Sequence, residues 1–169
     1  YASIINCCSQ LKTENWMETA YSIFQEMHEM KIEINHYVYS SLINGFKRIK
    51  NFKMAYNLYI DILKSLDSNS ILSPSNENSE NNFNTVLLNT ILDCCVECGE
   101  YKEMENIYLR HLKSNEFHKS DKKLNPDKFT YSILLKGYSK MNNCDKVMEI
   151  YNYLKDKDKE NNEMIEYNN

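Results

Sequence analysis

The chain has few of the residues that make turns: only 3 of its 169 residues are glycine and only 2 are proline. An all-β fold needs such residues at its many turns, so their scarcity argues against that class. No apolar run approaches the roughly 18 residues that a membrane-spanning helix requires, and we expect no association with a membrane. Hydrophobic residues make up 42% of the chain, which is enough to form the core of one domain.

Residues that bind metals or catalyse reactions form no recognisable motif. Cys95 and Cys98 make a C-x-x-C pair, but a zinc site needs a second pair of cysteines or histidines at similar spacing. Cys7 and Cys8 hold the same places in the first repeated unit as Cys94 and Cys95 in the third, so we expect small, buried side chains there. The sequence therefore predicts no catalytic residue, no metal, no cofactor and no small-molecule substrate.

The most informative feature of the sequence is a repeated helical pattern. Three pairs of residues are each separated by 20 positions: Tyr39 and Tyr59, Leu88 and Tyr108, and Tyr131 and Tyr151. Tyr1 and Phe24 form a fourth pair whose separation is three residues longer. The distance from one pair to the next varies, as expected for helical hairpins joined by loops of different length. The pattern predicts an all-α fold, an α-solenoid in which each hairpin buries its apolar face against its neighbours.

Four hairpins divide the chain. We expect the first over residues 1–35, with helices at 1–12 and 16–30 and a turn at Thr13-Glu14-Asn15, and the second over 36–65, with helices at 36–48 and 52–65. The third covers 85–127 with helices at 85–98 and 101–113 and then a loop insertion, and the fourth covers 128–162 with helices at 128–140 and 144–157. Gly99 should end the first helix of the third hairpin. Residues 66–84 are rich in Ser and Asn and are predicted to be a disordered insert, and residues 163–169 a tail.

Tyr1 aligns with Tyr39 and Tyr131, which lie a turn inside their helices, so we expect the chain to be an excerpt of a longer protein.

Charge is unevenly distributed over the hairpins. The net charge of −4 argues at first against nucleic acid. Residues 36–64, however, carry five basic residues and one acidic residue, and residues 128–155 carry five and two. Two of the four hairpins are therefore basic, and the overall charge is a poor guide to the partner.

The best copy of the repeat, N-P-D-K-F-T-Y-S-I-L-L-K-G-Y-S-K at 125–140, resembles the opening P-D-x-x-T-Y-N-x-L-I-x-G-x-x-K of the pentatricopeptide repeat family. Residues 37–48 followed by 54–62 are similar, and A-Y-S-I-F-Q-E-M at 20–27 matches that family's second helix. Tetratricopeptide repeats are also helical hairpins, but they open with Trp and a Leu-Gly pair, whereas these open with Tyr. The resemblance implies a right-handed superhelix that binds single-stranded RNA.

The same resemblance implies particular RNA-contacting residues, since such repeats read about one base per hairpin with two or three side chains. The base-specifying positions are the residue after the opening aromatic and the last residue before the next hairpin, and a third residue, two before that aromatic, stacks on the base. The base-specifying residues would be Asn35, Ser40, Asn84, Asn89, Asp127 and Ser132, the stacking residues Tyr37, Val86 and Phe129, and the phosphate contacts Arg48 and Lys140. Ser40 with Asn84 is the family's adenine choice and Asn89 with Asp127 its uracil choice.

Two functions remain open from the sequence. The first is sequence-selective RNA binding in support of organellar RNA processing, stability or translation. The alternative is a non-catalytic helical scaffold that binds other proteins, for instance as a subunit of an organellar ribosome or another large complex. The resemblance to the family also implies that the protein is located in a mitochondrion or a plastid.

Overall fold

The elements of the computed structural model, which describes residues 1–69, 84–113, 124 and 126–167, are helices paired in antiparallel hairpins. The hairpins are α1 (Ala2–Gln10) with α2 (Glu14–Glu29), α3 (His36–Arg48) with α4 (Phe52–Asn69), α5 (Thr85–Cys98) with α6 (Tyr101–Tyr108), and α7 (Lys128–Lys140) with α8 (Cys144–Tyr167). A π-helical turn, η1 (Leu109–Lys113), continues α6. The prediction of an all-α solenoid is confirmed.

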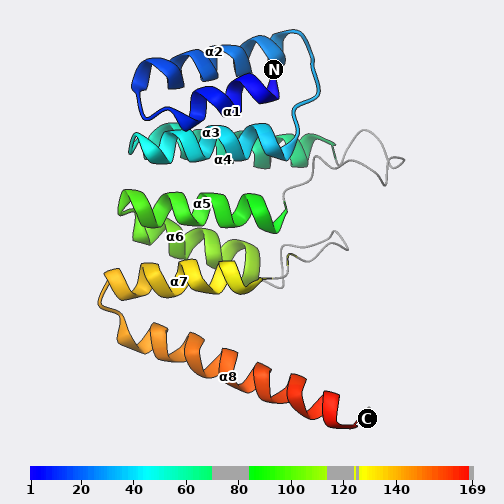
Figure 1. Ribbon diagram of the computed structural model, residues 1–169, viewed down its shortest axis with the longest axis vertical. Coiled ribbons are helices and arrows are strands. Elements are labelled where there is room, and N and C mark those ends of the chain that lie inside the picture. The colour runs from blue at the N-terminus through cyan, green and yellow to red at the C-terminus, as the bar shows by residue number, and fades with distance from the viewer. Residues whose placement is uncertain (70–83, 114–123, 125, 168–169) are drawn as a thin grey trace.

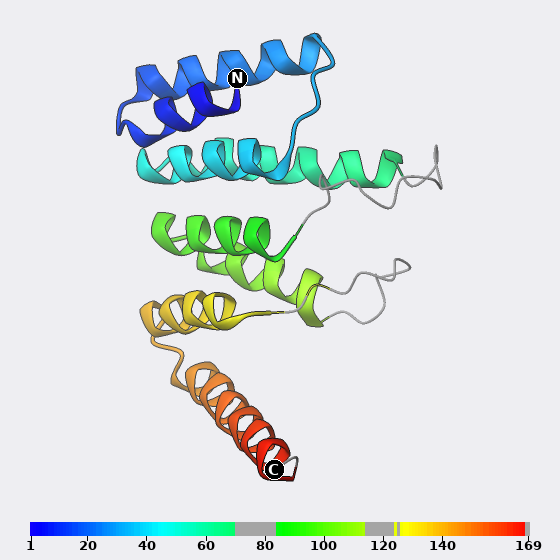
Figure 2. The ribbon, with the colours of Figure 1, turned by 45° about the vertical axis from the view of Figure 1, so that its right-hand side comes forward.

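The hairpins follow one another along the long axis of the molecule, with the N-terminus near one end and the C-terminus at the other (Figures 1 and 2). The first helices of successive hairpins contact each other, α1 with α3, α3 with α5 and α5 with α7. The second helices α2, α4 and α6 each contact the first helix of their own hairpin and that of the next. The four first helices thus form one continuous layer, and we call its solvent-facing surface the first-helix face.

Apolar residues at three- and four-residue steps form a core that runs through all four hairpins. Leu42, Ile43 and Phe46 of α3 are buried, as are Leu88, Ile91 and Leu92 of α5. Aromatic rings join hairpins 1 and 2, with the ring centroids of Phe24 and Tyr39 5.6 Å apart. Because each hairpin covers the apolar face of its neighbour, the repeats hold a fixed relative position.

The turn inside three hairpins has the same backbone conformation. Lys50, Gly99 and Asn142 each lie 11 residues after the opening residue of their hairpin and adopt the left-handed region, with φ of +59°, +83° and +54°. In each case the next residue donates a backbone hydrogen bond to a carbonyl five positions back, as in Asn51 N to Phe46 O at 2.9 Å. Gly99 ends α5 as predicted. The other two turns adopt the same geometry without glycine.

Two glycines in the first helices make room for methionines of the preceding hairpin. A Cβ added to Gly137 would collide with Met104 Sδ and lie 3.1 Å from Val96 Cγ2, and one added to Gly45 would collide with Met17 Sδ. Cys94 occupies the corresponding place in α5 and is buried, as are Cys8 and Cys95.

Three expectations from the sequence were wrong in detail. Cys7 is exposed rather than buried, although the adjacent Cys8 is buried. Glu14 and Asn15 belong to α2 rather than to the predicted turn, and Thr13 is its N-cap. Residues 66–69, assigned to the insert, continue α4, since each residue added to a formed helix gains a backbone hydrogen bond.

The remaining boundaries fall partly outside the described residues. The predicted disorder at 70–83 and the predicted insertion around 115–123 lie there. Helix α8 continues to Tyr167, past the expected end of hairpin 4 at residue 162. Within the described ranges, no helix is both long and apolar enough to cross a membrane.

Candidate nucleic-acid interface

Three apolar side chains project into solvent at equivalent positions of successive first helices. Tyr37, Val86 and Phe129 lie in the first turns of α3, α5 and α7, and they are 66%, 60% and 74% exposed. These are the residues that the sequence predicts to stack on bases. Exposed apolar side chains are common singly, but a row with one member per repeat is a regular surface that flat apolar ligands fit.

The residues that close each repeat cap the first helix of the next one. The side chains of Asn35, Asn84 and Asp127 accept hydrogen bonds from the backbone N–H of Val38 at 3.3 Å, of Leu87 at 2.9 Å and of Thr130 at 2.8 Å. This capping role was missed from the sequence, although an Asn or Asp directly before a helical pattern is its ordinary signal. Capping fixes these side chains at the edge of the first-helix face.

Asn89 and Asp127, predicted to act on one base, meet across the boundary between hairpins 3 and 4. Asn89 Nδ2 donates to Asp127 Oδ1 at 3.0 Å. The buried Thr130 supports both, since its Oγ1 lies 2.7 Å from Asn89 Oδ1 and 2.9 Å from Asp127 Oδ1. Asp127 N–H in turn donates to Thr130 Oγ1 at 3.1 Å, which completes a capping box. The pair presents an amide donor beside a carboxylate acceptor.

The carboxylate of Asp127 is held in its charged form. Partial burial acts to raise its pKa, but hydrogen bonds from the Thr130 backbone, from Asn89 and from the Thr130 hydroxyl outweigh it and lower the pKa below the usual value. Asp127 therefore offers only acceptor sites near neutral pH.

The other predicted pair, Ser40 with Asn84, is not brought together in the same way. Ser40 Oγ is buried and has no hydrogen-bond partner within the described part of the chain. In this rotamer its hydroxyl does not face solvent, so it reaches a base only after rotation about χ1. Ser132, at the equivalent place in α7, is exposed. Ala2 is exposed at that place in α1 and has no polar group.

The two predicted phosphate contacts have different surroundings. Arg48 Nη1 donates to the backbone carbonyl of Ser9 at 2.5 Å, near the C-terminal end of α1. The guanidinium thus joins α3 to α1 and satisfies a carbonyl at a helix end. Lys140 is exposed in the last turn of α7. Contact of either residue with phosphate stays a prediction.

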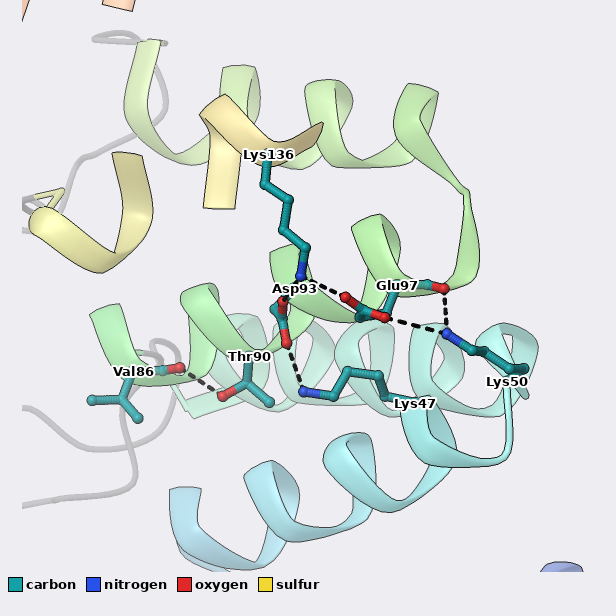
Figure 3. A network of polar contacts seen from close by, with 7 residues as sticks. All are labelled: Lys47, Lys50, Val86, Thr90, Asp93, Glu97 and Lys136. Carbon is teal, nitrogen blue, oxygen red and sulfur yellow. Dashed lines mark hydrogen bonds and ion pairs between the residues drawn. The ribbon is translucent and has the colours of Figure 1, made fainter. Parts of the chain in front are cut away.

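An ion-pair network, which sequence reasoning missed, crosses the middle of the first-helix face (Figure 3). Lys47 Nζ lies 2.6 Å from Asp93, and Lys50 Nζ lies 3.3 Å from Glu97. Lys136 of α7 reaches Glu97 at 2.5 Å and Asp93 at 3.8 Å. We call these five residues the lysine-carboxylate network. The sequence signal from which this network could have been predicted is the occurrence of opposite charges at facing positions of neighbouring hairpins.

The network keeps Glu97 ionised. Hydrogen bonds from Lys136 and then Lys50 lower the pKa of Glu97 to about 2, against a smaller opposing effect of burial. The pKa of Lys136 is raised, chiefly by its hydrogen bond to Glu97. Among the described residues, no group of three or more His, Cys, Asp or Glu side chains is arranged to hold a metal ion.

Comparison with known proteins agrees with the repeat pattern. A family model described as PPR repeat matches residues 86–110 and 129–158, and a model described as pentatricopeptide repeat domain matches residues 22–64. Together they cover more than half of the chain. A search of curated proteins finds no match. With its stacked hairpins, this chain belongs to the pentatricopeptide repeat family of RNA-binding helical-repeat proteins.

Proposed function

We propose that the chain binds single-stranded RNA selectively along its first-helix face, without catalysis. From the 5′ side, its four hairpins would accept in order any base, adenine, uracil and a purine. In the parent protein this activity supports RNA processing, stability or translation in a mitochondrion or plastid. The observation that carries the proposal is the Asn89–Asp127 pair, which lies between hairpins whose Val86 and Phe129 are exposed.

The chemistry of uracil suits this pair. Uracil carries an N3–H donor beside carbonyl acceptors, so the Asp127 carboxylate can accept from N3–H while the second Asn89 amide proton is donated to a carbonyl. Cytosine has an acceptor at N3, which would face the carboxylate unfavourably. A stacked base contributes about 1–3 kcal/mol, so the exposed apolar row provides affinity and the polar pair provides selectivity.

The test compares two single-stranded RNA probes that contain N-A-U-A or N-G-C-A within the same longer flanks, at matched salt. A third probe with N-A-C-A isolates the uracil position. We expect Asp127→Asn to reduce the preference for uracil over cytosine by about tenfold, because a hydrogen bond to a charged group contributes about 1.5–3 kcal/mol. Asp156→Asn, an exposed site on α8 with the same charge change, is the control.

Equal affinity for N-A-U-A and N-G-C-A would refute the base assignments. Absence of binding to either probe would refute RNA binding by this chain and favour the protein scaffold. That alternative has its own supporting observation, the large exposed side chains of Ile4 and Trp16 on hairpin 1. Fluorescence microscopy of the tagged full-length protein tests the organellar location.

A further inference from the structure

The lysine-carboxylate network lies on the face that we propose for RNA. We propose, on the basis of that function, that Asp93 and Glu97 compete with RNA phosphates for Lys47, Lys50 and Lys136. The chain then makes fewer phosphate contacts over hairpin 3 than its lysines allow. Asp93 and Glu97 are thus residues that limit affinity and salt dependence rather than residues that bind RNA.

The position of Glu97 in the repeat supports this inference. Arg48, Glu97 and Lys140 each lie nine residues after the opening residue of their hairpin. The two cations are the predicted phosphate contacts in hairpins 2 and 4. A carboxylate therefore stands in the same row, between two cations, where an RNA backbone that follows the hairpins would pass.

The contacts show how completely the two carboxylates engage the lysines. Each carboxylate contacts lysines from both neighbouring hairpins, so that Asp93 meets Lys47 and Lys136 while Glu97 meets Lys50 and Lys136. Lys50 Nζ also donates to the Glu97 backbone carbonyl at 2.6 Å. These lysine ammonium groups already have oxyanion partners at hydrogen-bond distance, which is the kind of contact that a phosphate oxygen would make.

The network is within reach of RNA. The side chains of Lys47, Lys50 and Lys136 are 21%, 60% and 45% exposed, and those of Asp93 and Glu97 are 26% and 32% exposed. A phosphate can therefore approach the lysines, but it must displace carboxylates that are tethered nearby and so act at high effective concentration. Glu97 remains ionised throughout the physiological pH range because of its low pKa.

Salt dependence of RNA binding tests the proposal, because the slope of log K against log salt is about −0.7 per phosphate contact for single strands. The test variant carries Asp93→Asn and Glu97→Gln. The matched control carries Asp61→Asn and Glu149→Gln, which remove the same charge from exposed ion pairs with Lys64 and Lys146 on second helices. Binding of the N-A-U-A probe is measured from 50 to 200 mM salt.

We expect the slope to become steeper by about 1–2 in the test variant, since up to three lysines are released for phosphates. Its gain in affinity over wild type at 50 mM then exceeds its gain at 200 mM by about 4- to 16-fold. The control should keep the wild-type slope. Lys50→Gln should change the slope little in wild type and reduce it by about 0.7 in the test variant.

An unchanged slope in a folded test variant, or the same change in the control, would overturn the inference while leaving RNA binding intact. Absence of wild-type binding would instead refute the proposed function and, with it, this inference. Thermal melts by circular dichroism establish folding. If the double variant does not fold, Glu97→Gln alone removes the carboxylate partner of Lys50, while Lys136 keeps its contact with Asp93, and should steepen the slope by about 0.7.

Discussion

Replacing Gly137 by alanine tests how closely hairpins 3 and 4 pack. In an ordinary helix interior, alanine in place of glycine stabilises a protein by about 1 kcal/mol. Here the added Cβ would collide with Met104 Sδ and lie 3.0 Å from Met104 Cε and 3.1 Å from Val96 Cγ2. Met104 and Val96 are both fully buried, so neither can move into solvent. Overpacking of a filled core costs about 1–3 kcal/mol.

The two effects oppose each other, and we expect Gly137→Ala to lower the free energy of unfolding by about 0–2 kcal/mol. The measurement is urea denaturation followed by circular dichroism, with the slope and midpoint compared between variants. Met104→Ala alone should cost about 2–5 kcal/mol through the cavity that it leaves. In the double variant the new methyl group occupies part of that cavity, so the combined loss should be smaller than the sum by about 0.5–3 kcal/mol.

Two results would refute this reasoning. A gain of about 1 kcal/mol in Gly137→Ala would show that the methyl group meets no resistance, as in an isolated helix. Additive losses in the double variant would show that Gly137 and Met104 do not share a contact. Gly45→Ala, which faces Met17 in the same way, provides an independent repeat of the experiment between hairpins 1 and 2.

Two further predictions concern capping and acid stability. Asp127→Ala removes the capping side chain of α7 and should destabilise the chain by about 0.5–2 kcal/mol in urea denaturation, whereas Asp127→Asn should retain most of that stability. A larger loss from Asp127→Asn than from Asp127→Ala would contradict the capping role. The pKa of Glu97 is lowered from its ordinary 4.5 to about 2, so its contribution to stability is present above pH 4.5 and is lost as the pH falls toward 2. Melting temperatures from pH 6 to 2 should therefore fall less for Glu97→Gln than for wild type, and parallel curves would argue against the ion pairs.

The helical framework could be predicted from the sequence because its signals are local. The bounds of α3, α5 and α7 agree with the predicted 36–48, 85–98 and 128–140. Their apolar periodicity is strong, and Asn or Asp marks each start. The ends of α1 and α4 were predicted less well, since α1 stops at Gln10, before the predicted 12, whereas α4 continues to Asn69, past the predicted 65.

Features that depend on two hairpins could not be predicted from one of them. The place of Met104, for example, depends on Gly137 of the next hairpin, which leaves room for its side chain. The burial of cysteines likewise depends on what lies against their helix, since Cys94 is buried while Cys7, at the equivalent position, is exposed. Repeat alignment assigns equivalent residues to equivalent positions, but their burial depends on what lies opposite.

The candidate site was predicted unevenly for the same reason. The exposed row of Tyr37, Val86 and Phe129 follows from repeat register alone. Register also places Asn89 beside Asp127, but the contacts by which Thr130 holds them together join two hairpins and could not be predicted from one of them. The buried hydroxyl of Ser40 depends on its rotamer, which sequence does not determine.

Under the proposed base assignments, the capping role of Asn35, Asn84 and Asp127 limits how the RNA target of this protein can change during evolution. Few side chains, chiefly those of Asn, Asp, Ser and Thr, cap the N-terminus of a helix well. A mutation to a long or apolar residue there would weaken the solenoid itself, whatever it did for the new RNA. Changes among these four residue types keep the helix capped, so under the same assignments a wider variety of targets depends on Ser40, Asn89 and Ser132, which are not helix caps.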